Sequence, residues 1–375
     1  MIMGYFATEV VIIPDRSSNM TLMLVIFVSL FGVMRPLRAT AQATHTLDFI
    51  QITDPHLFDA GADQDTNKAA LQWALSAVDW YGNHEAKASF LAFTGDCGLD
   101  CVQDPHSEPP PASCGKTALL HDAVDLMANY LDKVGLPIYF VPGNNDLVNE
   151  SSCDIAHYRD FIGALQESLR TKGSKTTVMD LTNAPAPISG LRIVGLNSAS
   201  FKNADKYDGK CITASKSNDT ASSASNELQK FSNSLTHDAA GANLPALVFT
   251  HEPDIQDPFR MIPIWSAEIS DVQAVKTWYE SLCKNSVLAV FAGHLHSQDF
   301  NKYGSPIMTT GADCGNGRTI PTLIAPPISA KNQNPMAPEA RGLLWVRIKL
   351  DDPYSVSVTP LWYARLLVGQ PFPRN

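Results

Sequence analysis

The chain has 375 residues, of which 45% are hydrophobic, and this is enough to bury a full core in one large domain or two small ones. We expect one domain. The formal net charge of −10 argues against stable binding of nucleic acid, because phosphate backbones require clustered Lys and Arg and the chain has no such run. An anionic substrate would therefore need metal ions to offset charge repulsion.

The N-terminal region has the pattern of a secretory signal. An apolar block at 20–33 is followed by two arginines and by the small-residue sequence Ala41-Gln42-Ala43, so cleavage is expected near Ala43. Residues 1–19 fit this signal poorly and are interpreted as lying upstream of the true start. Residues 1–43 are thus the leader, and 44–375 the folded domain.

A retained membrane anchor formed by residues 20–34 is the alternative interpretation. The apolar block is shorter than the roughly 20 residues that a membrane-spanning helix needs, so we favour a secreted or periplasmic protein. The protein would then contact a membrane only if this segment were retained.

Export would place the seven cysteines in an oxidising compartment, where disulfide bonds form. The odd number leaves at least one cysteine unpaired. Cys97 and Cys101 do not have the CxxC spacing of a metal or redox motif, and we expect Cys97 to pair locally with Cys101 or Cys114.

Five short apolar runs each end in polar residues. The first, Phe49–Ile52, contains β-branched residues typical of a buried strand and is followed by Asp54-Pro55-His56. Similar runs at 90–93, 137–141, 247–249 and 287–291 predict four further strands. They are followed, in order, by Gly95-Asp96, Gly143-Asn144-Asn145-Asp146, His251-Glu252 and Gly293-His294-Leu295-His296. Strand ends of an open α/β sheet form its crevice, so these side chains should meet at one edge.

Amphipathic patterns between the strands predict helices. These are expected at 65–81, 116–134, 151–170, 226–237 and 269–284, with a further strand at 191–197 and a polar loop at 200–225. Strands at 307–310, 322–325, 343–350 and 355–361 follow one another without long helices between them, which indicates antiparallel strands at the end of the sheet. The alternation of strands and helices predicts a layered α/β domain with parallel or mixed sheets.

The polar residues at these strand ends form a complete ligand set for two cations. Asp54, His56 and His296 can hold one ion, Asn144, His251 and His294 the other, and the Asp96 carboxylate can bridge them. The i, i+2 spacing of Asp54-x-His56 and His294-x-His296 lets both members of each pair point to the same side of an extended segment. Gly95, Gly143 and Gly293 remove side-chain bulk where the backbone crowds the ions.

These five motifs, in this order and each after an apolar strand, resemble the calcineurin-like metallophosphoesterase superfamily over roughly residues 45–300. The resemblance implies a four-layer α/β/β/α sandwich, a dinuclear metal centre and hydrolysis of phosphate esters. A second likeness, in Leu323–Ile328, Asn334-Pro335 and the expected strand 342–349, is to the acid sphingomyelinase-like branch, which includes secreted phosphodiesterases and endopolyphosphatases.

One residue departs from the family pattern. The third motif of the family is usually Gly-Asn-His, and its histidine is taken to protonate the leaving group, whereas this chain has Asn145 there. An amide donates a hydrogen bond but supplies no titrating proton near neutral pH. This favours substrates with good leaving groups, such as phosphodiesters, phosphoanhydrides or activated phosphomonoesters. Asp146 could supply the proton instead, but it could equally anchor the turn.

We therefore expect a metal-dependent phosphoric ester hydrolase that acts on a small or polymeric phosphate ester. Its predicted catalytic residues are Asp96, Asn144, Asn145 and His251, and the expected reaction is in-line attack on phosphorus by a hydroxide that bridges the metals. Histidine, carboxylate and amide ligands suit Fe, Zn or Mn. A non-catalytic metal-binding module of the same fold and a membrane-tethered hydrolase are the alternatives.

Overall fold

The computed structural model describes most of the chain outside the leader. The described residues are 10–12, 45–58, 64–84, 87–103, 118–146, 155–198, 219–236, 244–253, 272–296, 308–315, 317–329, 341–351 and 353–362.

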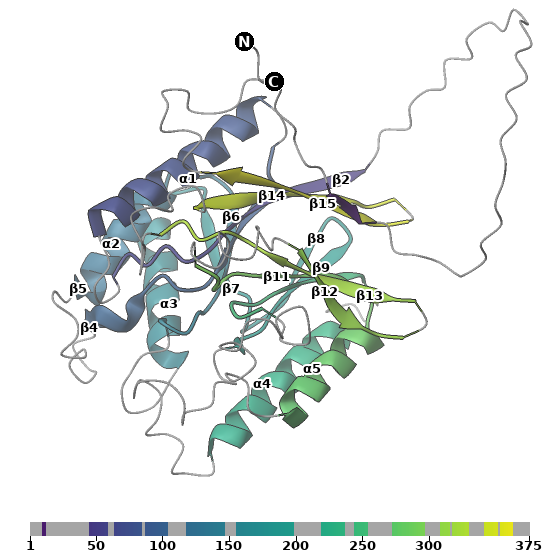
Figure 1. Cartoon of the computed structure of the whole chain (residues 1–375). Coiled ribbons are helices and arrows are strands. Elements are labelled where there is room, and N and C mark those ends of the chain that lie inside the picture. The colour runs from purple at the N-terminus through teal and green to yellow at the C-terminus, as the bar shows by residue number, and fades with distance from the viewer. Residues whose placement is uncertain are drawn as a thin grey trace, which may run out of the picture.

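Two large sheets stack face to face, and helices cover both outer faces (Figure 1). One apolar cluster lies between the first sheet and helices α1, α2 and α3, a second lies between the two sheets, and a third lies between the second sheet and helices α4 and α5. The fold is the four-layer α/β/β/α sandwich that the resemblance implied. Burial of apolar side chains in three successive layers is the main stabilising contribution.

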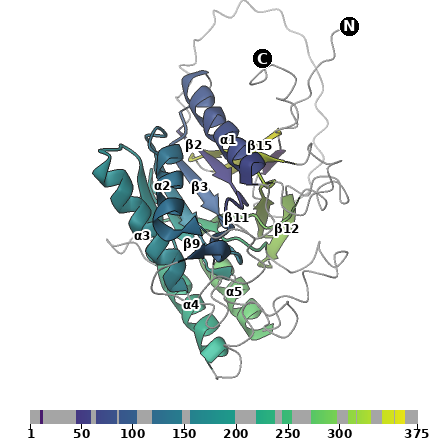
Figure 2. The same cartoon turned by 90° about the vertical axis from the view of Figure 1, so that its left-hand side faces the viewer.

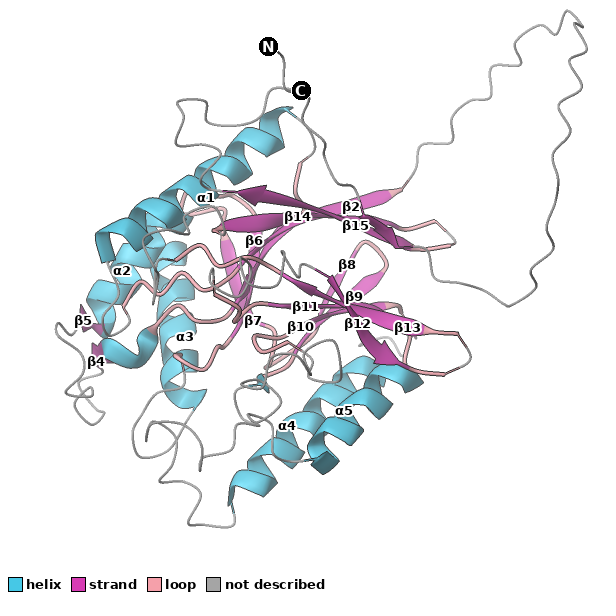
Figure 3. Cartoon of the chain, in the orientation of Figure 1, coloured by secondary structure: helices cyan, strands magenta, loops and turns pink. Residues whose placement is uncertain are grey.

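The first sheet has seven strands in the order β1-β15-β14-β2-β3-β6-β7. Figure 3 shows the strands of the molecule in magenta. Strands β2, β3, β6 and β7 are parallel, and β14, β15 and β1 continue the sheet in antiparallel pairs. The bounds are Val10–Ile12 for β1, Thr46–Ile52 for β2, Phe90–Thr94 for β3, Pro137–Val141 for β6, Thr177–Asp180 for β7, Gly342–Lys349 for β14 and Ser355–Trp362 for β15.

The second sheet has six strands in the order β12-β13-β11-β10-β9-β8. Strands β9, β10, β11 and β13 are parallel, while the edge strands β8 and β12 run antiparallel to their neighbours. The bounds are Ala186–Ile188 for β8, Leu191–Gly195 for β9, Ala246–Phe249 for β10, Val287–Ala292 for β11, Met308–Asp313 for β12 and Thr319–Ile324 for β13.

Five α-helices of the described residues form the outer layers. Helices α1 (Gln64–His84), α2 (Leu120–Leu131) and α3 (Ile155–Thr171) face the viewer in Figure 2. Helix α4 (Asp219–Thr236) packs beside α5 (Val272–Lys284) against the second sheet, in the lower part of the same view. A short 3-10 helix, Leu99–Cys101, leads into a two-stranded sheet of β4 (Val102–Gln103) and β5 (Ala118–Leu119).

Strand β2 buries apolar side chains on both of its faces, and its buried polar residues are Asp48 and Gln51. Leu47 and Phe49 face the space between the sheets, whereas Ile50 and Ile52 face the helices, and all four are at most 1% exposed. Strands buried on both faces read as continuous apolar runs. Phe49 stacks on Phe90 with ring centroids 4.6 Å apart and meets Phe249 and Phe291 of the second sheet edge-on.

Most predicted elements are present, but several bounds were wrong. The helix expected at 116–134 spans only α2, because residues 118–119 pair with β4 as a strand and Gly135 takes a φ of 66°. Helix α4 begins at Asp219, inside the segment expected to be a polar loop. The antiparallel strands at the C-terminal end were predicted correctly, although they belong to two sheets, and β7 and β8 were not predicted.

The predicted leader remains a prediction. Its apolar block lies outside the described residues, and none of the described helices combines the length and apolarity of a membrane span. Residues 10–12 form β1, which pairs with residues 356–358 of β15. Cleavage near Ala43 would therefore remove this short edge strand and leave β15 as the edge of the first sheet.

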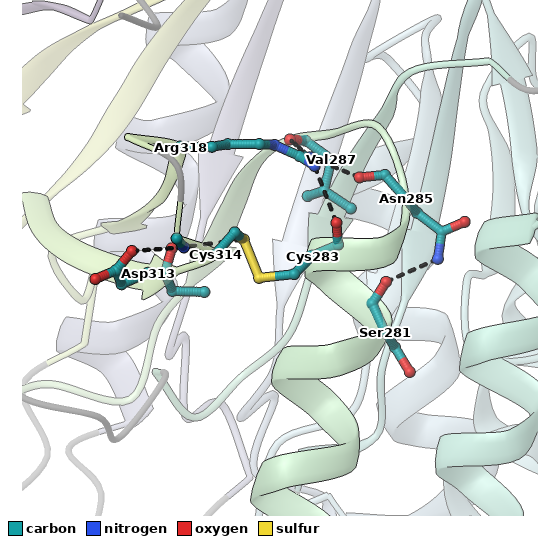
Figure 4. The surroundings of a disulfide bond; sticks show 9 residues. Ser281, Cys283, Asn285, Val287, Asp313, Cys314 and Arg318 are labelled. Carbon is teal, nitrogen blue, oxygen red and sulfur yellow. Dashed lines mark hydrogen bonds between the residues drawn. A yellow bond between two sulfur atoms is a disulfide. The ribbon is translucent and has the colours of Figure 1, made fainter. Parts of the chain in front are cut away.

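A disulfide bond joins Cys283, at the end of α5, to Cys314, just after β12 (Figure 4). Arg318 lies beside it and donates hydrogen bonds to the carbonyl oxygens of Cys283 at 3.0 Å, Asn285 at 2.6 Å and Val287 at 3.3 Å. The covalent bond and the guanidinium together attach the β12–β13 hairpin to the end of α5.

The predicted pairing of Cys97 was wrong. Cys97 is a free thiol, 2% exposed, in the apolar cluster under the first helix layer, so its sulfur is packed among hydrophobic side chains. Cys101 does form a disulfide, and its partner lies outside the described residues. Burial raises the pKa of the Cys97 thiol well above its usual value, which keeps it in the unreactive protonated form.

Replacing both Cys283 and Cys314 with Ser is expected to lower the free energy of unfolding by about 3–4 kcal/mol, because the bond closes a loop of 31 residues. Urea denaturation of the variant and the wild type measures this difference. Either single substitution should have nearly the same effect, since each one breaks the bond. An unchanged urea midpoint in the double variant would contradict a stabilising role.

Candidate active site

The candidate active site lies where the carboxyl ends of both sheets meet. Asp54, His56, Asp96 and Asn144 follow β2, β3 and β6 of the first sheet, and His251, His294 and His296 follow β10 and β11 of the second. Inward-facing positions of these strands are apolar up to Phe49, Phe249 and Phe291 and become polar or glycine at the strand ends. The polar site is therefore a continuation of the layer between the sheets.

The structure brings together the six histidine and carboxylate ligands that the sequence predicted. They form two groups, Asp54 with His56 and His296, and Asp96 with His251 and His294, and within each group the ligand atoms lie within 4.8 Å of one another. Five of the six residues are less than 9% exposed, and His296 is partly exposed. Each group combines residues from both sheets.

Asp96 lies between the two groups. Its Oδ2 is 3.2 Å from Nε2 of His251 in its own group and 3.6 Å from Nε2 of His56 in the other. One carboxylate oxygen close to both groups is the geometry that a bridging ligand requires. Asp54 Oδ1 is also close to both, at 3.5 Å from His56 Nε2 and 4.0 Å from His251 Nε2.

Two buried oxygens of the site accept no hydrogen bond from the described residues: Oδ1 of Asp54 and Oδ1 of Asn144. Such oxygens are costly to bury without a partner. A cation bound at each ligand group would give each oxygen a partner. The residues present thus fit the two-metal ligand set, including the amide ligand Asn144, which follows β6.

The backbone at the ligands is held in an unusual conformation. Five non-glycine residues of the described chain have a positive φ, and four of them are predicted ligands: Asp54 at 53°, His56 at 43°, Asp96 at 54° and His294 at 71°. Each such residue costs on the order of 1–3 kcal/mol, and residues of this kind concentrate at functional sites. Asn67 of α1 supports this conformation, because its Nδ2 donates a 2.9 Å hydrogen bond to the carbonyl oxygen of His56.

The three predicted glycines sit where no side chain fits. A Cβ on Gly143 would collide with the carboxylate and backbone nitrogen of Asp96, one on Gly95 with His251, and one on Gly293 with the hydroxyl of Thr53. The ligand loops can approach one another this closely only because these positions lack a Cβ.

Replacing Gly143 with Ala is therefore expected to displace Asp96, to destabilise the protein by about 1–3 kcal/mol as overpacking does, and to weaken metal binding. Gly163→Ala is the matched control, because a Cβ there has no atom within 4 Å and the position is inside α3. The control should be neutral or stabilising by roughly 0.5–1 kcal/mol. Thermal denaturation and metal titration of the two variants provide the comparison, and equal behaviour would contradict the role of Gly143.

Hydrogen bonds orient the ligands. The Nδ1–H of His251 donates to the carbonyl oxygen of Thr94 at 2.7 Å, which leaves Nε2 facing Asp96. Asp54 Oδ2 accepts from the Thr53 hydroxyl at 2.6 Å and from the backbone nitrogen of His294 at 2.9 Å, which leaves its Oδ1 facing the histidines. These bonds direct Nε2 of His251 and Oδ1 of Asp54 into the space between the two ligand groups.

The charges at the site favour a cation. Burial alone would lower the pKa of His251, but the charges of Asp96 and Asp54 outweigh it and raise that pKa to about 10. Burial would raise the pKa of Asp54, yet His251, His56 and His296 lower it to about 2. Burial lowers the pKa of His296 to about 4, which keeps its imidazole neutral. Without metal, His251 is therefore protonated beside two carboxylates, and a metal ion bound there would replace its Nε2 proton.

Asn145 and Asp146 have different roles. The backbone nitrogen of Asn145 donates to Asp96 Oδ1 at 2.8 Å and its side-chain Nδ2 donates to Asp96 Oδ2 at 2.7 Å. Asp146 is fully buried, and its carboxylate accepts from the backbone nitrogens of Gly98 and Gly143. Asp146 therefore anchors the turn, as one of the two interpretations held, and Asn145 holds Asp96.

Several supporting residues were missed from the sequence. Gln51 and Thr94 lie on strands and Thr53 follows β2 directly, and the apolar pattern did not mark these positions as functional. Ser198 is buried; its hydroxyl donates to the carboxylate of Glu252, next to His251, and accepts from the backbone nitrogen of Glu252. The backbone nitrogens of Ile328 and Ser329 donate to the carbonyl oxygens of Thr53 and Asp54, so the loop after β13 contacts the first ligand loop.

A family model described as calcineurin-like phosphoesterase matches residues 47–298, which include all seven predicted ligands. The chain belongs to the calcineurin-like phosphoesterase family. It is accordingly a metal-dependent phosphoric ester hydrolase, and the two ligand groups correspond to the dinuclear metal centre typical of this family.

Solved structures with similarity to this chain include two that each align with 84% of it. One is the protein TT1561 of Thermus thermophilus, with 10% sequence identity and a TM-score of 0.42 over 84% of this chain and 99% of that chain. The other is GAP50, described as the anchor in the inner membrane complex of Plasmodium, with 11% identity and a TM-score of 0.42 over 84% of each chain. None of the curated proteins matches the chain.

Proposed function

We propose that this phosphoesterase is an exported enzyme that hydrolyses phosphodiesters, phosphoanhydrides or activated phosphomonoesters with a pair of metal ions. One observation carries the proposal: the Asp96 carboxylate is close to the histidines of both ligand groups, each of which combines residues from both sheets, and the amide of Asn145 bonds that carboxylate. Fe, Zn or Mn suits the donor set of imidazole, carboxylate and amide groups.

In this proposal Asp54, His56 and His296 hold one cation, and Asn144, His251 and His294 hold the other, with Asp96 between them. When bound, the two cations would supply Lewis acidity and lower the pKa of a water molecule enough for it to attack phosphorus. The chain's own contribution is positional. Thr94 fixes the tautomer of His251, Thr53 and the backbone of His294 hold one oxygen of Asp54, and Asn145 holds Asp96.

Neither Asn145 nor Asp146 is arranged as a proton donor to a leaving group. The side-chain N–H of Asn145 is directed to Asp96, and both carboxylate oxygens of Asp146 accept backbone hydrogen bonds. A leaving group that departs as a weak base needs no such donor. This supports phosphoanhydrides, aryl esters and activated diesters over alkyl monoesters as substrates.

The test of the activity is metal analysis of the purified protein followed by a substrate panel. We expect about two metal ions per chain, and phosphate or alcohol release from bis-aryl phosphodiesters, pyrophosphate or polyphosphate, and aryl monophosphates. A protein that holds two metal ions and hydrolyses none of these substrates would contradict the proposal.

Export is supported by two features besides the apolar block at 20–33. The Cys283–Cys314 bond and the disulfide of Cys101 are typical of proteins from oxidising compartments. Sequencing the amino terminus of the mature protein tests the proposal. A start at Thr44 is expected for cleavage after Ala43, and a mature chain that retains residues 20–34 would favour the membrane-tethered alternative.

A further inference from the structure

The amide side chain of Gln51 joins the two sheets at the strand ends that precede the metal ligands. Gln51 lies on β2, on the face that Leu47 and Phe49 turn towards the second sheet, and it is 0% exposed. Its Nε2 donates to the hydroxyl oxygen of Thr94 on β3 at 2.9 Å and to the carbonyl oxygen of Ala292 on β11 at 2.8 Å. The second bond crosses from the first sheet to the second.

The amide of Gln51 is polar, whereas the layer between the sheets behind it is apolar. Further into the layer between the sheets the side chains are apolar, including Phe49, Phe249 and Phe291, and an aliphatic residue at position 51 would extend this apolar layer towards the ligands. The Oε1 of Gln51 is buried and accepts no hydrogen bond from the described residues. A buried amide with an unsatisfied oxygen is less favourable for folding than a well-packed apolar side chain, so a stabilising role does not explain it.

Both bonding partners of Gln51 lead directly to ligands. The carbonyl oxygen of Thr94 accepts from His251 Nδ1 at 2.7 Å and from the Thr53 hydroxyl, which also bonds Asp54. Ala292 precedes the Gly293-His294 turn, and the backbone nitrogen of His294 donates to Asp54 Oδ2. Gln51 is therefore connected to His251 through Thr94 alone, and to Asp54 and His294 through two residues each.

The separation of the sheets at this edge controls the ligand geometry. Asp54 and His56 come from the first sheet and His296 from the second, and Asp96 and Asn144 from the first meet His251 and His294 from the second. Metal–ligand distances are tolerated within about 0.2 Å, so a small change in sheet separation disturbs both sites together.

We infer that Gln51 is a positioning residue that sets the spacing of the two sheets at the metal edge, and so the fit of both cations. This rests on the proposed dinuclear site and extends it to a residue that contacts neither cation. It acts through Thr94 and Ala292.

The test compares Gln51→Met with the wild type. Methionine keeps the length and most of the volume of the side chain but removes both N–H donors. We expect the metal-free variant to denature at or above the wild-type temperature, while its affinity for Mn²⁺ in calorimetric titration falls by about 10–100-fold, as when a group outside the first coordination shell is lost. The exchange-coupled EPR spectrum of the di-Mn²⁺ form should also change, because the distance between the ions changes.

Two further variants make the result specific. Ile50→Val removes a methylene from the adjacent position of β2, which faces the helices, so it should lower stability without changing the EPR spectrum. Thr94→Val removes the hydroxyl acceptor and keeps the carbonyl that binds His251, so it should reproduce part of the Gln51→Met effect. This variant also serves if Gln51→Met does not fold.

The outcomes separate this inference from the proposed function. A wild type that binds fewer than two Mn²⁺ ions overturns both. A wild type with two ions, and Gln51→Met and Thr94→Val variants with unchanged affinity and an unchanged EPR spectrum, overturns only the role of Gln51. An Ile50→Val variant with the same spectral change as Gln51→Met would also overturn it, because the effect would then be one of general packing.

Discussion

Replacing Asp96 with Asn is expected to lower turnover by about 10³-fold or more and to remove at least one of the two bound metal ions. Loss of a group outside the coordination shell alone costs about 10–100-fold in metal affinity or activity, and Asp96 is proposed to bind both cations directly. Its Oδ2 lies 3.2 Å from His251 Nε2 and 3.6 Å from His56 Nε2, so the group that replaces this oxygen affects both ligand groups. An amide offers one neutral oxygen in place of two that share a negative charge.

The measurement combines metal content with hydrolysis of an aryl phosphodiester. Asp122→Asn is the matched control, since it makes the same chemical change at an exposed carboxylate of α2. Circular dichroism and thermal denaturation should show that the Asp96→Asn protein is folded. A folded variant with two metal ions and activity within a few-fold of the wild type would contradict the bridging role of Asp96.

The ligands could be predicted from the sequence because they obey a simple rule. Each follows a short apolar run, and parallel strands carry the residues at their carboxyl ends to one edge. The ligands that follow β2, Asp54 and His56, meet those that follow β11, His294 and His296. These two pairs lie in different sheets and are far apart in the sequence. Motif order and residue type were sufficient for this part of the site.

The interactions that support the ligands could not be predicted from the sequence, and the reason is physical. Gln51 and Thr94 are polar residues near the ends of largely apolar strands, and pattern reasoning treats such a residue as a minor exception. Whether a polar residue in a strand has a role depends on which groups face it in the folded chain. For Gln51, the facing group is the carbonyl oxygen of Ala292 in the other sheet. Cys97 shows the same limit, because its pairing depends on the direction in which the chain turns after Asp96, and that turn is set by a left-handed backbone conformation.

Short elements with weak sequence patterns were also missed in the prediction. Strands β7 and β8 have four and three residues, and they are held by pairing with β6 and β9 more than by their own sequence. The start of α4 in a polar segment is another example, since Leu228, Phe231 and Leu235 are the helix residues that bury apolar surface. Tertiary contacts determined these bounds.

The wild-type enzyme is expected to hydrolyse aryl phosphate esters faster than alkyl esters by about 10²-fold or more. General acid assistance contributes about 10²- to 10⁴-fold to reactions that need it, and an alkoxide leaving group needs it far more than a phenoxide. The structure offers no such acid from the third motif, because the amide of Asn145 is bonded to Asp96 at 2.7 Å and Asp146 accepts two backbone hydrogen bonds. Equal rates on alkyl and aryl esters of matched size would contradict this argument.

Asn145→His supplies the reciprocal experiment. A histidine next to Asn144 introduces a group that can donate a proton, so alkyl ester hydrolysis should rise relative to aryl ester hydrolysis and the ratio of the two rates should fall by about 10-fold or more. Asn145→Ala is the control, because it also removes the hydrogen bond to Asp96 Oδ2 but adds no donor. Both variants should lose some metal affinity through that lost bond, so rates are compared at saturating metal. If Asn145→Ala lowers the ratio as much as Asn145→His does, the change comes from Asp96 and the leaving-group argument fails.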